Sequence, residues 1–150
     1  MKGLIQRVSH ASVVVEGETV GSIDRGLLLL LGVEKHDTEV QLDKLLNKII
    51  AYRVFPDEAG HMNLSLRDMG GELLVVSQFT LAADTQKGLR PSFSSAAHPD
   101  DANRMYELFV HKARALVKRV ETGRFGADMK VSLLNDGPVT FLLESAPAKI

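Results

Sequence analysis

The sequence predicts a single mixed α/β domain of the α+β type, in which two main helices cover a largely antiparallel sheet. Two observations predict this class. Short runs of branched apolar residues occur near both ends of the chain, and two central segments carry apolar residues at helical spacing. The 150 residues show no repeat, linker or low-complexity segment, so we interpret residues 1–150 as one domain.

The first third of the chain is predicted to form strands. Residues 4–8 and 12–15 are short runs rich in branched side chains. Gly17 supplies the positive φ of a hairpin turn that leads into residues 19–23. Residues 27–33 form a continuous apolar run, which is typical of a strand covered on both faces.

The first helix is predicted to begin at Thr38. This residue and Gln41, three positions later, fit a capping box, in which each side chain bonds the backbone of the other. Pro56 and the turn-like residues 57–60 end the segment. The apolar stripe of this helix is Leu42, Leu45, Leu46 and Ile49.

The second helix is predicted to run from Pro99 to Gly123. A proline followed by acidic residues favours a first turn, and glycine commonly ends a helix. The apolar stripe of this helix is Ala102, Met105, Phe109, Ala113, Leu116 and Val120.

The remaining segments flank the second helix. Residues 73–76 form a second buried strand, and the polar stretch at residues 82–97 is long enough to indicate a functional loop. After the helix, residues 131–134 and 139–144 are predicted strands, joined by a turn at residues 135–138.

Composition excludes several classes of protein. The chain has no cysteine, which excludes disulfides, thiolate metal sites and a cysteine nucleophile. Its N-terminus lacks a signal-peptide pattern and no apolar run is long enough to span a bilayer, so we expect a cytoplasmic protein that does not enter membranes. The formal net charge of −1 indicates that any contact with RNA is local rather than a long basic track.

Motifs of common enzyme classes are missing. The five histidines are scattered without metal-ligand spacing, so we expect all of them at the surface and predict no metal site. The sequence has no nucleophile elbow, phosphate-binding loop or dinucleotide fingerprint, and we predict no cofactor.

Two segments carry the remaining chemical signal. Ser77, Gln78 and Thr80 follow a very apolar strand, where rigidly held backbone N–H groups become free for a ligand. The plainer interpretation is that these side chains satisfy the turn that leaves the sheet. Asn135 to Pro138 is most simply a turn; only about 5–6% of X–Pro bonds are cis, so the sequence alone favours trans.

Taken together, the two segments resemble the paired signature motifs of the D-aminoacyl-tRNA deacylase family. The motifs are residues 77–81 (Ser-Gln-Phe-Thr-Leu) and residues 135–140 (Asn-Asp-Gly-Pro-Val-Thr). Further matching segments are residues 6–8, 32–34, 62–64, 90–93 and 122–125, so the resemblance covers the whole chain. It implies a barrel-like sheet and a homodimer that splits D-aminoacyl-tRNA into free D-amino acid and tRNA.

The resemblance also implies roles for individual residues. The site for the aminoacylated terminal adenosine would be lined by Ser77, Gln78, Phe79 and Thr80. Gly137 and Pro138 would form a cis peptide that reaches into the partner subunit's site, where it rejects L-amino acids, and Arg7 would steady it. The amino-acid end of the pocket would be walled by Met129, Phe125 and Ala102.

The expected chemistry is ester hydrolysis. Backbone N–H groups of Phe79 and Thr80 are candidates to stabilise the developing oxyanion. A threonine nucleophile needs an activating base, and the sequence places no histidine or lysine beside Thr80. We therefore expect Thr80 to position the substrate while water attacks, assisted by the ribose 2′-hydroxyl. Glycine has no side chain to reject, so glycyl-tRNA should also be hydrolysed.

Two alternatives remain open at this point. One is a small-molecule esterase, and the other is a non-catalytic nucleic-acid-binding module, which the net charge and the absence of an aromatic cluster disfavour. The basic face of the second helix is interpreted as solvated; its residues are His111, Lys112, Arg114, Lys118 and Arg119. Lys87 and Arg90 in the long loop are the better phosphate candidates.

Overall fold

A six-stranded sheet forms the centre of the computed structural model, which describes residues 1–147. Strand β1 (Lys2–Val15) uses both of its edges. One edge pairs with β8 (Lys130–Glu144), and the other pairs first with β3 (Gly26–Gly32) and then with β2 (Glu18–Ile23). β1 is therefore one long strand, not the two short ones expected.

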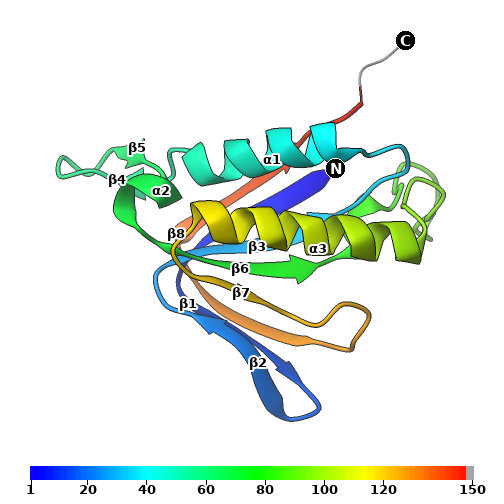
Figure 1. Cartoon of the computed structure of the whole chain (residues 1–150), viewed down its shortest axis with the longest axis horizontal. Helices are drawn as coiled ribbons and strands as arrows, with labels where there is room; N and C mark the ends of the chain where they lie inside the picture. The colour runs from blue at the N-terminus through cyan, green and yellow to red at the C-terminus, as the bar shows by residue number, and fades with distance from the viewer. Residues whose placement is uncertain (148–150) are drawn as a thin grey trace.

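The sheet continues from β3 to β6 (Glu72–Ser77) and β7 (Val120–Thr122) and then approaches β2 again. Between the last two strands, the Arg119 guanidinium donates a 3.1 Å hydrogen bond to the carbonyl oxygen of Ser22. The sheet is thus nearly closed, as a barrel is (Figure 1). The three pairings of β1 are antiparallel, and β3–β6 and β6–β7 are parallel, so the expected barrel-like, largely antiparallel sheet is confirmed.

The central strands β3 and β6 are buried on both faces, as predicted for the leucine-rich run. Leu27, Leu29 and Leu31 pack in a cluster with the helices, whereas Leu28 packs in a second cluster within the barrel. This alternation follows from the two-residue period of a strand. Two long helices, α1 (Glu39–Ala51) and α3 (Pro99–Leu116), cover the sheet on one side (Figure 1).

The first helix has the predicted cap. The backbone N–H of Val40 donates to the Thr38 hydroxyl at 3.2 Å, and the N–H of Thr38 donates to the Gln41 side chain at 2.7 Å. A small hairpin of β4 (Phe55–Pro56) and β5 (Met62–Leu64) follows, and then the one-turn helix α2 (Leu66–Met69). These three short elements were not expected.

The second long helix is shorter than predicted. It ends at Leu116, which is 42% exposed, and not at Gly123. Val120 is buried in β7, where it pairs with Leu73 of β6. The chain pairs with the open edge of β6 here. Hydrogen bonds to the backbone groups of this buried strand stabilise β7 more than a continued helix would, although the helical spacing of apolar side chains continues.

The predicted turn at residues 135–138 is also wrong. Strand β8 runs through this segment, and its register against β1 shifts twice between Gln6 and His10. The extra residues bulge out of the ladder, as β-bulges do. The Gly137–Pro138 peptide bond is cis, as the family resemblance implied.

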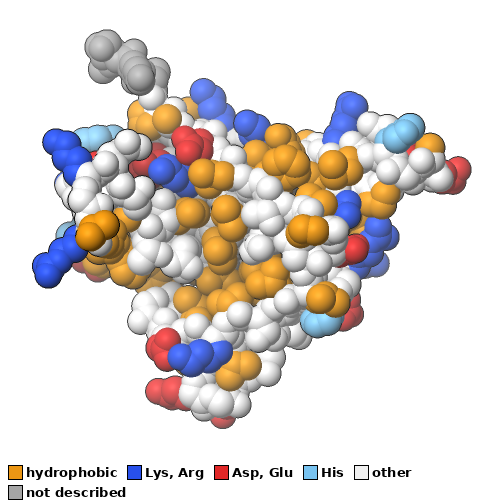
Figure 2. All heavy atoms as spheres, turned by 180° about the vertical axis from the view of Figure 1, so that it is seen from behind, with side chains coloured by type: hydrophobic (Ala, Val, Ile, Leu, Met, Phe, Trp, Pro, Cys, Tyr) orange, Lys and Arg blue, Asp and Glu red, His pale blue; other side chains and the backbone are white. Residues whose placement is uncertain are grey.

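Strand β8 leaves many apolar side chains uncovered. Within it, only Leu143 is buried, whereas Leu134, Phe141 and Leu142 are exposed. Figure 2, the view from behind, shows hydrophobic side chains gathered over the middle of this face of the molecule. Contiguous exposed apolar surface of this kind commonly marks an interface.

Candidate active site

The first candidate motif lies where β6 ends. Gln78 leaves the strand with its N–H bonded to the carbonyl oxygen of Leu31 at 2.8 Å, and the chain then turns into the 3-10 helix η1 (Phe79–Ala82). Within the described residues, neither the N–H of Phe79 nor that of Thr80 donates to a protein acceptor. Two neighbouring backbone donors are therefore available, because the first N–H groups of a helix lack partners within it.

Two side chains of this motif, those of Gln78 and Thr80, hydrogen-bond to each other. The Gln78 carboxamide donates a hydrogen bond to the Thr80 hydroxyl. Thr80 is exposed, and Ser77 and Gln78 are half-buried. The hydroxyl of Thr80 therefore accepts one hydrogen bond and keeps its own proton to donate.

A hollow of about 430 Å³ opens beside this strand end. It lies between the end of β6, the beginning of α3 and the segment that leads from β7 into β8. Segments distant in the sequence thus meet at one place. Six of the ten residues predicted for the site line this hollow: Ser77, Gln78, Phe79, Ala102, Phe125 and Met129.

The wall opposite the motif is apolar and closely fitted. The sulfur of Met129 accepts a hydrogen bond from the N–H of Arg124 at 3.4 Å. A Cβ atom on Gly123 would lie 2.5 Å from that sulfur, so a larger residue there would force the methionine side chain to move. The ring of Phe125 packs on Tyr106, with 6.0 Å between ring centroids. The hollow thus has a largely apolar wall at one end and the polar strand end at the other.

Phe79, which lines the hollow, belongs to an exposed aromatic pair, here called the aromatic lip. Phe79 is 62% exposed and packs against Phe93, which is 43% exposed, with 5.3 Å between ring centroids. Phe93 comes from the long polar stretch, which is held by two backbone hydrogen bonds between Asp84 and Ser92. Sequence reasoning did not include Phe93 in the site, although a lone aromatic residue within a polar loop was a usable signal.

The second candidate motif lies elsewhere. Gly137, Pro138 and Arg7 do not line the hollow of their own chain. Arg7 donates from Nε to the carbonyl oxygen of Asp136 at 2.7 Å and from Nη1 to that of Val54 at 2.7 Å. The guanidinium thus contacts the Gly-Pro segment, at the place that the family resemblance implied.

Asn135 also holds this segment, and sequence reasoning gave it no role. Its amide nitrogen donates to the carbonyl oxygen of Val139 at 3.3 Å and to the Thr140 hydroxyl at 3.0 Å, while its Oδ1 accepts from the N–H of Val139 at 2.7 Å. The tendency of asparagine to bond nearby backbone was the available signal. A Cβ on Gly137 would lie 2.7 Å from Cγ2 of Val139, so this position requires glycine.

Among the residues that line the hollow, Asp128 carries the one ionisable side chain, and its carboxylate pairs with Lys130 at 3.0 Å. All five histidines are exposed, and none lines the hollow. Burial raises the pKa of Tyr106, behind the wall, to about 12, and its hydroxyl donates to the carbonyl oxygen of Val75 at 3.0 Å. Among residues 1–147, no cluster of three or more potential metal ligands occurs, and no helix is long and apolar enough to cross a membrane.

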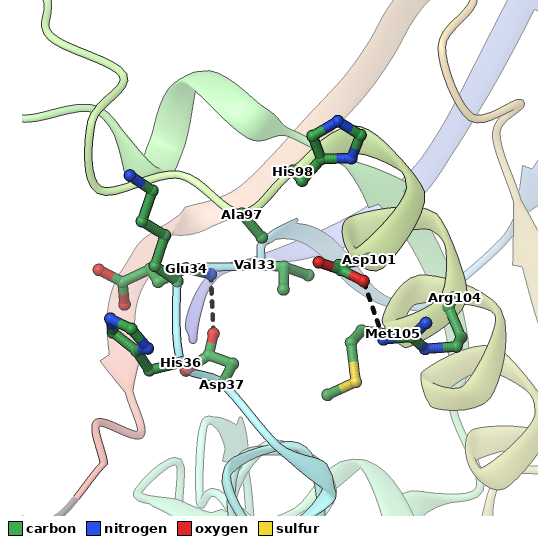
Figure 3. Close-up of a pocket in the computed structure, with 10 residues that line it drawn as sticks. Val33, Glu34, His36, Asp37, Ala97, His98, Asp101, Arg104 and Met105 are labelled. Atoms are coloured by element: carbon green, nitrogen blue, oxygen red, sulfur yellow. Dashed lines mark hydrogen bonds and ion pairs between the residues drawn. The ribbon is translucent and has the colours of Figure 1, made fainter.

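A second hollow, of about 370 Å³, lies between the β3–α1 connection and the start of α3 (Figure 3). Its three carboxylates, those of Glu34, Asp37 and Asp101, are paired. Asp37 accepts the N–H of Glu34 at 2.7 Å and the α-ammonium group of Met1 at 2.9 Å, and Arg104 pairs with Asp101 at 2.9 Å. Burial raises the pKa of Asp37, and these hydrogen bonds oppose that rise. We assign this hollow a structural role.

Comparison with known proteins decides the family. The D-Tyr-tRNA(Tyr) deacylase family model matches residues 4–144. The chain belongs to this family. D-aminoacyl-tRNA deacylases of Saccharophagus degradans and Pseudoalteromonas translucida are 62% and 64% identical to it, each covering 95% of this chain and 99% of the relative.

Two solved structures are similar to the fold of this deacylase family member. The c-Myc DNA unwinding element binding protein has a TM-score of 0.94 and 42% identity, covering 99% of this chain and 100% of the other. A probable eukaryotic D-amino acid tRNA deacylase has a TM-score of 0.81 at 16% identity, covering 95% and 98%, and at that identity it supports the fold alone.

Proposed function

We propose that this protein hydrolyses the ester bond of D-aminoacyl-tRNA and releases the free D-amino acid and tRNA. One observation carries the proposal: the two free N–H groups of Phe79 and Thr80 stand at the edge of a hollow whose far wall is apolar. An ester bound with its carbonyl oxygen at these donors would place the amino acid against that wall. Membership of the deacylase family supports the same reaction.

The reaction requires attack at the ester carbonyl carbon. Water adds to this carbon, and the oxyanion that forms accepts hydrogen bonds from the N–H groups of Phe79 and Thr80. The bond to the ribose oxygen then breaks as that oxygen takes the proton that the water loses. Thr80 donates its hydroxyl proton to a substrate acceptor, since Gln78 already donates to the oxygen of Thr80. Among the described residues no histidine, lysine or carboxylate is hydrogen-bonded to Thr80, so water, helped by the ribose 2′-hydroxyl, is the nucleophile.

The aromatic lip suits the terminal adenosine. Phe79 and Phe93 present exposed ring surface next to the strand end, and bases stack on such rings without sequence preference. With the adenine base on the aromatic lip and the amino acid in the hollow, the ester that joins them would be held in place. Transfer of the base from water to the lip adds binding energy that the reacting ester itself does not supply.

We further propose a homodimer in which Gly137 and Pro138 complete the partner subunit's site. Three observations support this arrangement. The two residues do not line their own hollow, Arg7 and Asn135 hold them in place, and the same strand exposes Leu134, Phe141 and Leu142. A second copy seated on β8 would cover those side chains and bring the Gly-Pro segment to its hollow.

This arrangement accounts for selection between the D and L enantiomers of the amino acid. Carbonyl oxygens of the Gly-Pro segment would accept the substrate's α-ammonium group, which offers three donors. With the ester and the amino group both held, a D side chain points to open space, whereas an L side chain meets the Gly-Pro backbone and is rejected. Glycine has no side chain to meet it, so glycyl-tRNA would also be cleared. Since charged tRNA is the proposed substrate, we also propose that the protein works in the cytoplasm.

The deciding experiment is hydrolysis of matched D- and L-tyrosyl-tRNA by the purified protein, with and without EDTA. We expect rapid cleavage of the D ester alone, unchanged by EDTA, and sharply slower cleavage by Thr80→Ala. Gly137→Ala should alter the preference for D- over L-tyrosyl-tRNA. Hydrolysis of simple D-amino acid esters at an equal rate would favour the small-molecule esterase instead.

A non-catalytic nucleic-acid-binding module is the second candidate, and the name of the solved relative that binds a DNA unwinding element favours it. Under that function, folded dimeric protein would bind nucleic acid and cleave neither ester. Binding carried by phosphates alone would collapse as the salt concentration rises.

A further inference from the structure

A third hollow, of about 370 Å³, lies between α3 and the end of β7. Two arginines line it, Arg114 from α3 and Arg124 from the segment after β7, together with His111. Both arginines are exposed, and neither forms an ion pair within residues 1–147, whereas Arg104 and Arg119 each pair with a carboxylate. Two guanidinium groups without a protein partner thus border one concave surface.

This hollow adjoins the proposed active site. Phe125 lines both hollows, and its ring packs on Tyr106, which lines only the third. The Tyr106 hydroxyl is itself bonded to the carbonyl oxygen of Val75, which fixes the ring. The two hollows therefore share an aromatic wall, formed by Phe125 with Tyr106 behind it.

The charge of the third hollow is mixed. Glu107 and Asn103 also line it, beside the two arginines. A bare anion would meet the carboxylate unfavourably. A nucleotide instead offers a phosphate for the guanidinium groups and neutral base N–H groups for the carboxylate, and both kinds of hydrogen bond are charge-assisted.

We propose that this third hollow binds the nucleotide that immediately precedes the terminal adenosine of tRNA. Arg114 and Arg124 hold its phosphate, and Glu107 and Asn103 face its base. The inference rests on the proposed function, because it requires the terminal adenosine at the neighbouring hollow. It assigns RNA binding to α3, whose basic face the sequence analysis interpreted as solvated.

Binding of deacylated tRNA tests the inference without reference to catalysis. We would measure fluorescence anisotropy over a salt series for wild type, for the Arg114→Gln/Arg124→Gln double variant and for Lys48→Gln, an exposed lysine on α1 that forms no ion pair among the described residues. The double variant should bind about tenfold more weakly, as expected for lost charge-assisted bonds. Its log–log salt slope should fall by about 0.7 per lost phosphate contact. Lys48→Gln should match wild type.

Kinetics provide the second arm. The double variant should show an increase of about tenfold in KM for D-aminoacyl-tRNA, again from lost charge-assisted bonds. Hydrolysis of D-aminoacyl-adenosine, which lacks the preceding nucleotide, should be unchanged.

Two results would overturn the inference: an unchanged affinity and salt slope in the double variant, or equal impairment with both substrates, which would indicate damage to the shared Phe125 wall. If wild type cleaves neither substrate, the proposed function fails, while the binding measurement still decides the third hollow.

Discussion

Oδ1 of Asn135 accepts a 2.7 Å hydrogen bond from the backbone N–H of Val139, across the base of the bulge that carries Gly137 and Pro138. The amide nitrogen of the same side chain donates to the carbonyl oxygen of Val139 and to the hydroxyl of Thr140, which both follow the bulge in the sequence. Asn135 thus closes the bulge from within, while Arg7 supports it from β1.

Removal of this clamp should loosen selection between D and L substrates. In Asn135→Asp the acceptor remains but the two donor bonds are lost, so we expect the ratio of kcat/KM for D- over L-tyrosyl-tRNA to fall by about tenfold. Asn47→Asp, an amide-to-acid change at an exposed position of α1, is the matched control. An unchanged ratio in a folded Asn135→Asp dimer would show that the clamp does not govern selection.

The Thr80 hydroxyl should act in positioning and not as a nucleophile. Thr80→Val keeps the shape but removes the hydroxyl, and we expect kcat to fall by about a hundredfold, the typical effect of losing one oriented donor. Thr80→Ser should keep most of the activity. Rapid quenching followed by mass spectrometry is the direct measurement, and a covalent aminoacyl group on Thr80 would contradict the water mechanism.

Gly123→Ala should strain the wall of the hollow. Its added methyl group would overlap the sulfur of Met129, and such overpacking costs about 1–3 kcal/mol in free energy of unfolding. Met129→Ala removes the sulfur, so the double variant should be less destabilised than the sum of the two single changes. Denaturant unfolding of all four proteins measures this coupling, and strict additivity would mean that the methyl group is accommodated elsewhere.

The β4–β5 hairpin should be sensitive to acid. A hydrogen bond from the Asn63 side chain, together with backbone bonds from His61 and its neighbours, lowers the pKa of Asp57. A carboxyl whose pKa is lowered on folding contributes stability above its unfolded pKa and loses it as pH falls through the folded one. NMR titration should find the Asp57 pKa below that of a free aspartate and closer to it in Asn63→Ala; an identical pKa in both proteins would contradict this.

Local patterns in the sequence predicted much of the fold. The cap at Thr38, the stripe of α1 and the two-sided burial of the leucine-rich strand all depend on spacing within a few residues, and all are confirmed. Val120 continued a helical spacing but joined β7, because the edge of β6 that pairs with it lies far away in the sequence. Such pairing leaves no local signal.

The site shows the same division. Ser77 to Thr80 were found from their place after an apolar strand, and the wall residues came from family resemblance; the structure brings Ser77, Phe125 and Met129 to one hollow. Phe93 was missed because its contact with Phe79 depends on how the long loop folds back. The clamp by Asn135 was missed because residues 135–138 were interpreted as a simple turn.

Strand β8 begins at the wall of the hollow, next to Met129, and continues to the Gly-Pro bulge and the exposed apolar residues near its end. Because side chains alternate along a strand, a slip of one residue would turn all of them to the opposite face. In the proposed dimer, each copy of β8 would therefore serve two catalytic sites, one with its beginning and the other with its middle. A mutation that shifts this strand in one subunit would impair both sites of the pair, so mixed dimers should lose more than half of the wild-type rate.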